Sequence, residues 1–455
     1  MMPMVIEKIV KKDLCIGCGM CAAICPDNLF KMNFNNFGEY NPFPIADCEK
    51  NCGLCLKVCP FADSGENEDT IGKDLYGSMK GIEHLPETGY YLQAYVGYSE
   101  KFRDFGASGG MATWVMEKLL DEKVVDYIVS VIPHNDSQFL FTYSISGNIK
   151  DLHTGTGSVY YPVELSEIIK SILKTPGKYA VIGLPCFIKA LRLAQKKNVK
   201  LKDRILVTLG LTCGQLKNAQ YTKYIAALSG VYGQIVKVHY RGKVVDKPAN
   251  NYFFSCKSSV GKEGKRFWRD GISDIWINRW FTLNSCNYCD DIFAECADVT
   301  LMDAWLSPYT KDGRGTNLVL IRSPLIQNII NNGIDCHEIV LNHIPVQKII
   351  RSQSGLIQSK REDLAYRIFL AQENMKITPI KRIKPERIKH YLPRLKIQLK
   401  LRIQNKSKLF FGSIQNQDPD IIMIQKKMKY DEIFLKILQH LDYVSIIKFI
   451  KRKLS

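Results

Sequence analysis

The chain has 455 residues, of which 46% are hydrophobic, so it can bury the cores of two or three domains and is not a disordered protein. Its net charge of +18 is uneven, because residues 376–455 contain 20 basic and 6 acidic side chains and so carry +14 of it. Charge of this kind suits nucleic acid, an anionic membrane or an acidic partner. No nucleic-acid reading motif accompanies it, so we expect no nucleic-acid function.

The sequence contains 15 cysteines, and its first residues show no apolar segment typical of a signal peptide. The longest apolar stretches fall short of the ~18 residues needed to cross a bilayer. We therefore predict a cytoplasmic protein with reduced thiols, in which metal binding is the leading use of cysteine.

Eight of the cysteines form two runs that each end in Cys-Pro, namely Cys15, Cys18, Cys21 and Cys25, then Cys48, Cys52, Cys55 and Cys59. This spacing is that of a bacterial two-cluster ferredoxin, in which the fourth cysteine of a run binds the other cluster. We predict one [4Fe-4S] cluster on Cys15, Cys18, Cys21 and Cys59, and a second on Cys48, Cys52, Cys55 and Cys25. The second run departs from the pattern by one extra residue in its first gap. Buried apolar thiols and two four-thiolate zinc sites are the alternatives, but neither requires the paired Cys-Pro endings.

The predicted domains are a ferredoxin domain (1–65), a polar linker without periodicity (66–92), a central domain (93–345) and a basic C-terminal segment (346–455). In the central domain we expect strands at 92–98, 127–131, 179–185 and 205–212, a hairpin-like stretch at 139–152, and helices at 111–120, 162–173 and 221–227. Apolar strands followed by helices predict an α/β class (α+β overall) with a largely parallel sheet. Ser108, Gly109 and Gly110 precede the first helix. The free amides at the start of this helix could bind an anion; the alternative is a helix start without a ligand.

Four further cysteines are expected to converge. Cys186 and Cys213 each follow a predicted strand, and the carboxyl ends of parallel strands share one edge of a sheet, where ligands usually bind. Cys286 and Cys289 add a close pair, which would complete a third four-thiolate site. The alternative is that the first two are core residues and the pair is half of a surface metal clip. Cys256, Cys296 and Cys336 are interpreted as ordinary thiols.

Several motifs together resemble the family of coenzyme F420 hydrogenase/dehydrogenase beta subunits, over about residues 93–325. They are Ser108-Gly109-Gly110, Gly157-Ser158, Gly183-Leu184-Pro185-Cys186, Thr212-Cys213-Gly214, Cys286-x-x-Cys289 and Asp303-Ala304-Trp305. The resemblance implies a [4Fe-4S] cluster on Cys186, Cys213, Cys286 and Cys289 beside a flavin, usually FAD. It implies flavin contacts at Ser108, Gly109 and Gly110 and at Gly157, Ser158 and Tyr160. Val159 stands where the family has a lysine, which puts the phosphate contact or deazaflavin binding in question.

The C-terminal segment supports two readings of residues 395–403, a strand of period 2 or a helix with a basic face. Residues 430–454 predict an amphipathic helix with Ile433, Ile437, Leu441, Val444 and Phe449 on its apolar stripe and a basic end at 448–453. Such a helix could dock on the protein itself, on an acidic partner or on an anionic membrane.

The leading hypothesis is an iron-sulfur flavoprotein oxidoreductase that exchanges electrons with a redox partner protein or ferredoxin. Its flavin would exchange hydride with a deazaflavin coenzyme or another organic substrate, because clusters carry single electrons and a hydride carries two. The rivals are an electron-transfer subunit without a substrate site and a binding module with a degenerate flavin site. No side chain stands out as a catalytic acid or base.

Overall fold

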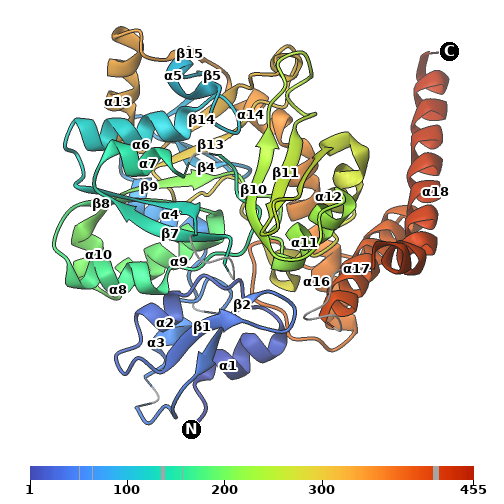
Figure 1. Ribbon diagram of the computed structural model, residues 1–455, viewed down its shortest axis with the longest axis horizontal. Coiled ribbons are helices and arrows are strands. Elements are labelled where there is room, and N and C mark those ends of the chain that lie inside the picture. Colours follow the sequence, from blue (N-terminus) through green and yellow to red (C-terminus); the bar gives the residue numbers. More distant parts are fainter. Residues whose placement is uncertain (51, 64, 135–138, 156, 413–419, 455) are drawn as a thin grey trace.

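The computed structural model describes residues 1–454 except 51, 64, 135–138, 156 and 413–419, and it describes side chains up to 441 apart from those of 411 and 412. A central sheet lies above a small N-terminal domain, with a smaller sheet and the last helices beside it (Figure 1). In spatial order the central strands are β15 (Val340–His343), β5 (Gln93–Tyr98), β14 (Asn317–Ile321), β13 (Val299–Asp303), β9 (Ile205–Leu211), β8 (Tyr179–Gly183), β6 (Tyr127–Pro133) and β7 (Phe141–Ser146).

The predicted α/β class is confirmed, but the sheet is mixed rather than largely parallel. Strands β13, β9, β8 and β6 are parallel neighbours, whereas β7, β14, β5 and β15 join the sheet by antiparallel pairing. The connection from β6 to β7 is too short for the dozen or more residues that a parallel crossover requires. The parallel centre brings the ends of β8 and β9 to the same edge.

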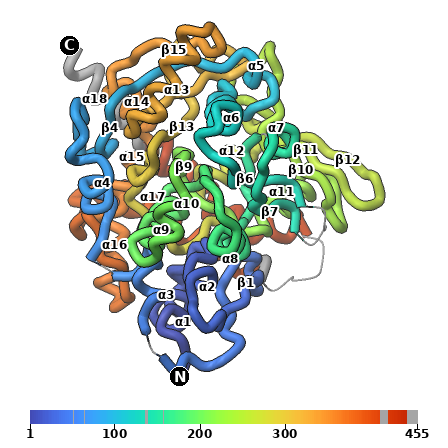
Figure 2. The backbone as a smooth tube through the Cα atoms, turned by 90° about the vertical axis from the view of Figure 1, so that its left-hand side faces the viewer, coloured from blue at the N-terminus to red at the C-terminus, as the bar shows by residue number. Residues whose placement is uncertain are grey.

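Helices cover both faces of this sheet. Helices α6 (Met111–Asp121) and α13 (Pro324–Asp335) pack on one face, and α8 (Ser166–Lys174), α9 (Pro185–Gln195) and α10 (Val199–Arg204) lie on the other. In β8, Ala180 and Ile182 face the first core, which α6 and α13 cover. Tyr179 and Val181 face the second core, which α8, α9 and α10 cover, because side chains alternate along a strand. The second core continues into the N-terminal domain, which lies directly below α8 (Figure 2). The two domains therefore share one core.

The N-terminal domain consists of α1 (Met4–Lys8), α2 (Met20–Ala23), β1 (Phe30–Phe34), β2 (Tyr40–Pro44) and α3 (Leu54–Lys57). The segment predicted as a linker contains regular structure: α4 (Glu68–Tyr76), β3 (Glu83–Leu85) and β4 (Gly89–Tyr91). A capping box of Asn67 and Thr70 begins α4, and Ile71 and Tyr76 are buried. This helix has only nine residues, which is too short for a sustained helical period to appear in a polar stretch.

The smaller sheet consists of β10 (Ile235–Gly242), β11 (Phe253–Ser258) and β12 (Glu263–Phe267), beside α11 (Ala219–Leu228) and α12 (Ser273–Ile277). Two expectations require correction. The hairpin-like stretch at 139–152 is β7 followed by α7 (Ile149–His153), because Asn148 caps a helix start by accepting from the amide of Asp151. The helix expected from residue 162 begins only at Ser166.

The C-terminal part is helical: α14 (Val346–Ser352), α15 (Ser354–Ile357), α16 (Asp363–Glu373), α17 (Tyr391–Gly412) and α18 (Ile421–Leu454). Residues 395–403 are thus helix, not strand. No helix of the described residues is long and apolar enough to span a membrane.

Helix α18 buries a different row of side chains from the predicted stripe. Ile424, Met428, Leu435 and Leu438 are buried, whereas Ile433, Ile437 and Leu441 are about half exposed. The buried row packs in the core that α17 and α11 share, so neighbouring helices select it. Val444, Phe449 and the basic end at 448–453 lie outside the described side chains.

Candidate functional site

Four predicted cluster ligands line one cavity of about 340 Å³ in the N-terminal domain. These are Cys25, Cys48, Cys52 and Cys55, which we call the outer thiol group. The remaining wall includes Met4, Leu29 and Phe30. Cys52 is exposed, so this group lies close to the protein surface.

The other four N-terminal cysteines, Cys15, Cys18, Cys21 and Cys59, form the inner thiol group. Burial raises the pKa of the Cys18 thiol, and the charges of Cys59 and Cys15 raise it further, so the three lie close together. Burial likewise raises the pKa of Cys21, with contributions from Cys18, Cys15 and Cys59. The structure thus places Cys59 beside the first three cysteines of the first run, and Cys25 in one cavity with the first three of the second run.

Glycines allow the chain to wrap tightly around the inner thiol group. Gly17 has a φ of 71° and donates its N–H to Cys15 Sγ over 3.3 Å. Gly19 has a φ of 77°, and a Cβ there would come within 2.2 Å of Glu164 Oε2. Larger residues at these positions would be strained in the backbone and would clash.

Cys186, Cys213, Cys286 and Cys289 are also brought together, and we call them the third thiol group. Cys186 is the second residue of α9, directly after β8, and Cys213 follows β9. The other two lie on and just after the short 3₁₀ helix Asn284–Tyr288. Burial raises the pKa of Cys186, and the charges of Cys289, Cys213 and Cys286 raise it further.

The inner and third thiol groups adjoin one another. Ser285, the neighbour of Cys286, donates its Oγ hydrogen to the carbonyl of Cys15 over 3.3 Å. Tyr143 lies between the groups: burial raises its pKa, and the charges of Cys186 and Cys18 add to that effect. The shared core of the two domains thus places the two thiol groups next to each other.

Four buried basic side chains surround the third thiol group: Lys217, Arg279, Lys360 and Arg367. Burial lowers the pKa of Lys217, Arg279 and Arg367, most strongly that of Lys217. Lys360 Nζ donates to Cys289 Sγ over 3.1 Å. Burial disfavours its charged form, but the charges of Cys289 and Cys213 outweigh this effect and raise the pKa of Lys360. Sequence reasoning missed all four, since Lys360 lies 71 positions from Cys289 and no motif connects them.

These surroundings fit an anionic iron-sulfur centre. Buried cations without ion-pair partners are costly, and a [4Fe-4S] centre with four thiolates carries about −2. Among the described residues, no three His, Cys, Asp or Glu side chains are gathered closely enough to hold a single metal ion. The fit to a larger centre therefore rests on four buried or half-buried thiols and on the positive charge that faces them.

A second cavity, open to solvent, lies beside the predicted flavin segment Ser108–Gly110, of which Ser108 lines it. Its lining includes Ser108, Arg241, Lys243, Asp303 and Trp305. A Cβ on Gly109 would come within 2.8 Å of the Gly97 carbonyl oxygen, and one on Gly110 within 2.5 Å of the Phe102 backbone. The small residues are thus required by close backbone packing.

The expected open amides at the start of α6 are only partly available. The N–H of Met111 donates to Asn317 Oδ1 over 3.1 Å, so one of them is already satisfied. Ser108 Oγ itself donates to the carbonyl of Thr316 over 2.8 Å.

The second predicted flavin segment reaches the same region. Tyr160 lies near Arg241, Asp303, Tyr252 and Ser158, and its burial raises its pKa. Gly157 has a φ of 115°, and a Cβ there would lie 3.9 Å from His239 Nε2. Of the six predicted flavin residues, all of them described, Ser108 alone lines the cavity, and Tyr160 lies behind its wall residues Arg241, Tyr252 and Asp303.

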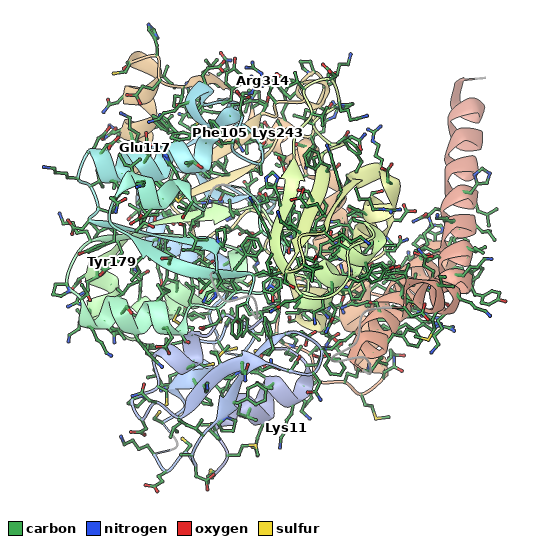
Figure 3. All side chains as sticks on the ribbon, viewed as in Figure 1. Lys11, Phe105, Glu117, Tyr179, Lys243 and Arg314 are labelled. Carbon is green, nitrogen blue, oxygen red and sulfur yellow. The ribbon has the colours of Figure 1, made fainter. Side chains whose placement is uncertain are left out.

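Two cations at this cavity were not anticipated from the sequence. Arg241 forms two hydrogen bonds with Asp303, of 2.8 and 2.9 Å. Lys243 donates to the carbonyls of Arg103, Ser108 and Arg314, and Lys243 and Arg314 lie at the same end of the molecule (Figure 3). Burial and the neighbouring Arg241 lower the pKa of Lys243 to about 8. Positive charge is thus present here although residue 159 is valine.

The remaining cysteines lie apart from these groups. Cys256 and Cys296 are buried, and Cys336 is exposed. The carbonyl of Cys296 accepts hydrogen bonds from Tyr76 and Arg192, so this residue contributes to packing and backbone bonding.

Three family models match the chain. Residues 94–170 match the N-terminal part, and residues 177–346 the C-terminal part, of the coenzyme F420 hydrogenase/dehydrogenase beta subunit. Residues 14–62 match a 4Fe-4S dicluster domain. Together these matches include every cysteine of the three thiol groups.

Known proteins show more distant similarity. The chain is 20% identical over 377 residues to one of the subunits of F(420)H(2) dehydrogenase from Methanosarcina mazei, covering 79% of this chain and 93% of that protein. It is 27% identical over 313 residues to the coenzyme F420-dependent sulfite reductase of Methanocaldococcus jannaschii, covering 65% of this chain but only 43% of that protein.

Among solved structures, a chain of the F420-reducing [NiFe] hydrogenase complex from Methanosarcina barkeri matches 66% of this chain and 98% of its own length. The TM-score is 0.48 and the identity 16%. The matched models, taken with the arrangement of the sites, show that the chain belongs to the family of coenzyme F420 hydrogenase/dehydrogenase beta subunits and carries a 4Fe-4S dicluster domain at its N-terminus.

Proposed function

We propose that the protein is an iron-sulfur flavoprotein that moves electrons between a redox partner and a flavin, which exchanges hydride with a deazaflavin coenzyme or another organic substrate. The observation that carries this proposal is the third thiol group, which lies beside the inner thiol group and is surrounded by buried cations. A protein with a ferredoxin function alone would not require four more converging thiols and an additional cation-lined site.

Each thiol group has a proposed role. The outer group, near the surface, is suited to a centre that meets the partner, and the inner group connects it to the third group. Bound clusters would supply one-electron transfer, and a bound flavin would supply the conversion to two-electron chemistry. The protein itself holds the thiols in the spatial order outer, inner and third group, and it buries the inner and third groups.

The cavity at Ser108 is the proposed flavin or deazaflavin site. Arg241 and Lys243 are suited to a phosphate or carboxylate of the ligand, and the Tyr252 and Trp305 rings provide apolar walls. Arg241 is already oriented by Asp303, so it could bind an anion without first being ordered. This positive charge would replace the lysine that the family has at position 159.

A second candidate is an electron-transfer subunit that has no substrate site of its own. The Methanosarcina mazei relative, which the chain covers almost completely, is named as a subunit of a larger enzyme. The basic C-terminal segment is a proposed docking surface for an acidic partner or an anionic membrane. Some of its charge is used internally, however, because Lys408 pairs with Asp13 and Glu39.

Anaerobic preparation with iron, sulfide and flavin assays tests the proposal. Three centres predict about twelve irons per chain. About eight irons would contradict the third centre, and a preparation that neither contains nor binds a flavin would favour the electron-transfer subunit.

Removing the charge at the cavity should weaken flavin binding. We expect the double variant Arg241→Met with Asp303→Asn to bind flavin or deazaflavin about 10- to 100-fold more weakly, because a charge-assisted hydrogen bond contributes about 1.5–3 kcal/mol. Changing both residues leaves no unpaired buried charge. Fluorescence titration measures the affinity, and the exposed Arg269→Met is the control. Unchanged affinity in a variant with full iron content would rule out this cavity.

A further inference from the structure

The buried cations around the third thiol group are held by neutral groups. Lys217 Nζ donates to the Trp280 carbonyl over 2.7 Å and to Thr282 Oγ1 over 3.1 Å. Arg279 and Arg367 both bond to Asn287, to its side-chain oxygen over 2.7 Å and its carbonyl over 2.9 Å. Within the described part of the chain, none of the four cations forms an ion pair with a carboxylate. Their charge is therefore not neutralised by a direct ion pair.

Asn287 connects these cations to the thiols. It lies between Cys286 and Cys289, so both arginines are fixed to the loop that carries the thiol pair. Lys217 follows Leu216, whose N–H donates to Cys286 Sγ over 3.2 Å. Lys360 contacts Cys289 directly. The positive charges thus surround the thiols from several elements of the fold.

The inner thiol group has carboxylates close to its thiols. The carboxylates that act on its thiols are Glu39 and Asp13, at Cys15, and Glu164, at Cys18. Lys408 pairs with the first two, so their charge is partly balanced. Around the third group, Asp363 faces Arg279 and Arg367, and the buried carboxylate of Asp291 acts on Cys213.

We propose that Arg279, Lys360 and Arg367 raise the reduction potential of the third centre above that of the inner centre. The inference rests on the proposed function, which assigns an iron-sulfur centre to these thiols. Reduction adds one electron, and so one negative charge, to a centre without forming or breaking a bond. Fixed positive charge in a buried, weakly screened site favours the reduced form. Electrons that enter through the outer centre would therefore reside mainly on the third centre, in the central domain.

A redox titration of the full, loaded chain followed by low-temperature EPR tests this proposal, with dithionite as reductant. Arg367→Gln should change the ratio of oxidised to reduced third centre at least tenfold, a fall in midpoint potential of about 59 mV for one electron. Asp363→Asn removes a negative charge and should shift the potential upward. Arg367→Lys should restore most of the wild-type value. The exposed Lys237→Gln is the control, and the ferredoxin signals should stay in place throughout.

The possible results distinguish a failure of the proposed function from a failure of the inference about the reduction potential. A wild-type protein without a third signal overturns the proposed function, and this inference falls with it. A third signal whose potential is the same in all variants, or lies below that of the inner centre, overturns the inference and leaves the proposed function intact. Should Arg367→Gln fail to fold, Arg279→Gln and Asp363→Asn decide the sign.

Discussion

Substituting Cys286 by serine should remove about one third of the iron and leave the ferredoxin signals unchanged. The thiol is buried, accepts a hydrogen bond from the Leu216 amide over 3.2 Å and belongs to the third thiol group. A four-iron centre that loses a thiolate inside a cation-rich pocket loses both a ligand and part of the compensating charge. Iron and sulfide assays should fall from about twelve to about eight atoms per chain, with EPR reporting which centres remain.

A buried cysteine outside the three groups provides the matched control. Cys256 is 4% exposed and lies on β11, and burial raises its pKa to about 11, which keeps it a thiol at neutral pH. Cys256→Ser should retain all the iron. Loss of ferredoxin signals in Cys286→Ser, or full iron in that variant, would contradict the assignment of the third thiol group.

Replacing Arg382 by methionine should destabilise the protein by about 3–5 kcal/mol, the usual cost of removing one partner from a buried ionic network. Its side chain is 7% exposed and pairs with Glu295 over 2.7 Å and with Asp290 over 3.3 Å. Those carboxylates lie on the segment that follows Cys289. The variant would leave them buried with less compensating charge, although Lys381 and Arg361 remain nearby.

Urea unfolding of the loaded protein, followed by circular dichroism, measures this loss. Arg387→Met is the control, because Arg387 is exposed and lies five residues along the same segment. Equal midpoints for the two variants would show that the network contributes little. A selective loss of iron from the third centre before global unfolding would show that it holds the Cys289 segment in place.

Local spacing was sufficient to predict the ferredoxin domain, because a cluster ligand set is encoded within short runs such as Cys15 to Cys25. The convergence of Cys186 and Cys213 was also predictable, since both follow strands of one parallel region. The assignment of iron to particular thiols and of flavin to particular residues stays a prediction.

Other features depend on contacts between distant segments and could not be predicted. Arg367 meets Asn287 across 80 positions, and Arg382 meets Glu295 across 87. The structure of 66–92 depends on α4 burying Ile71 against the central domain, which its own polar sequence does not reveal. In α18, the choice of buried row is made by the helices that pack against it.

The return of the C-terminal segment to the N-terminal half has a consequence for biosynthesis. Lys360 contacts Cys289, Arg382 pairs with Glu295 and Lys408 pairs with Asp13, so residues made later complete surroundings begun by residues made earlier. On the ribosome, the ferredoxin cysteines emerge long before these partners. We therefore expect the N-terminal centres to be loaded first, while the chain is still being made. The third centre should be loaded only after the segment that contains Lys360 and Arg382 has been synthesised.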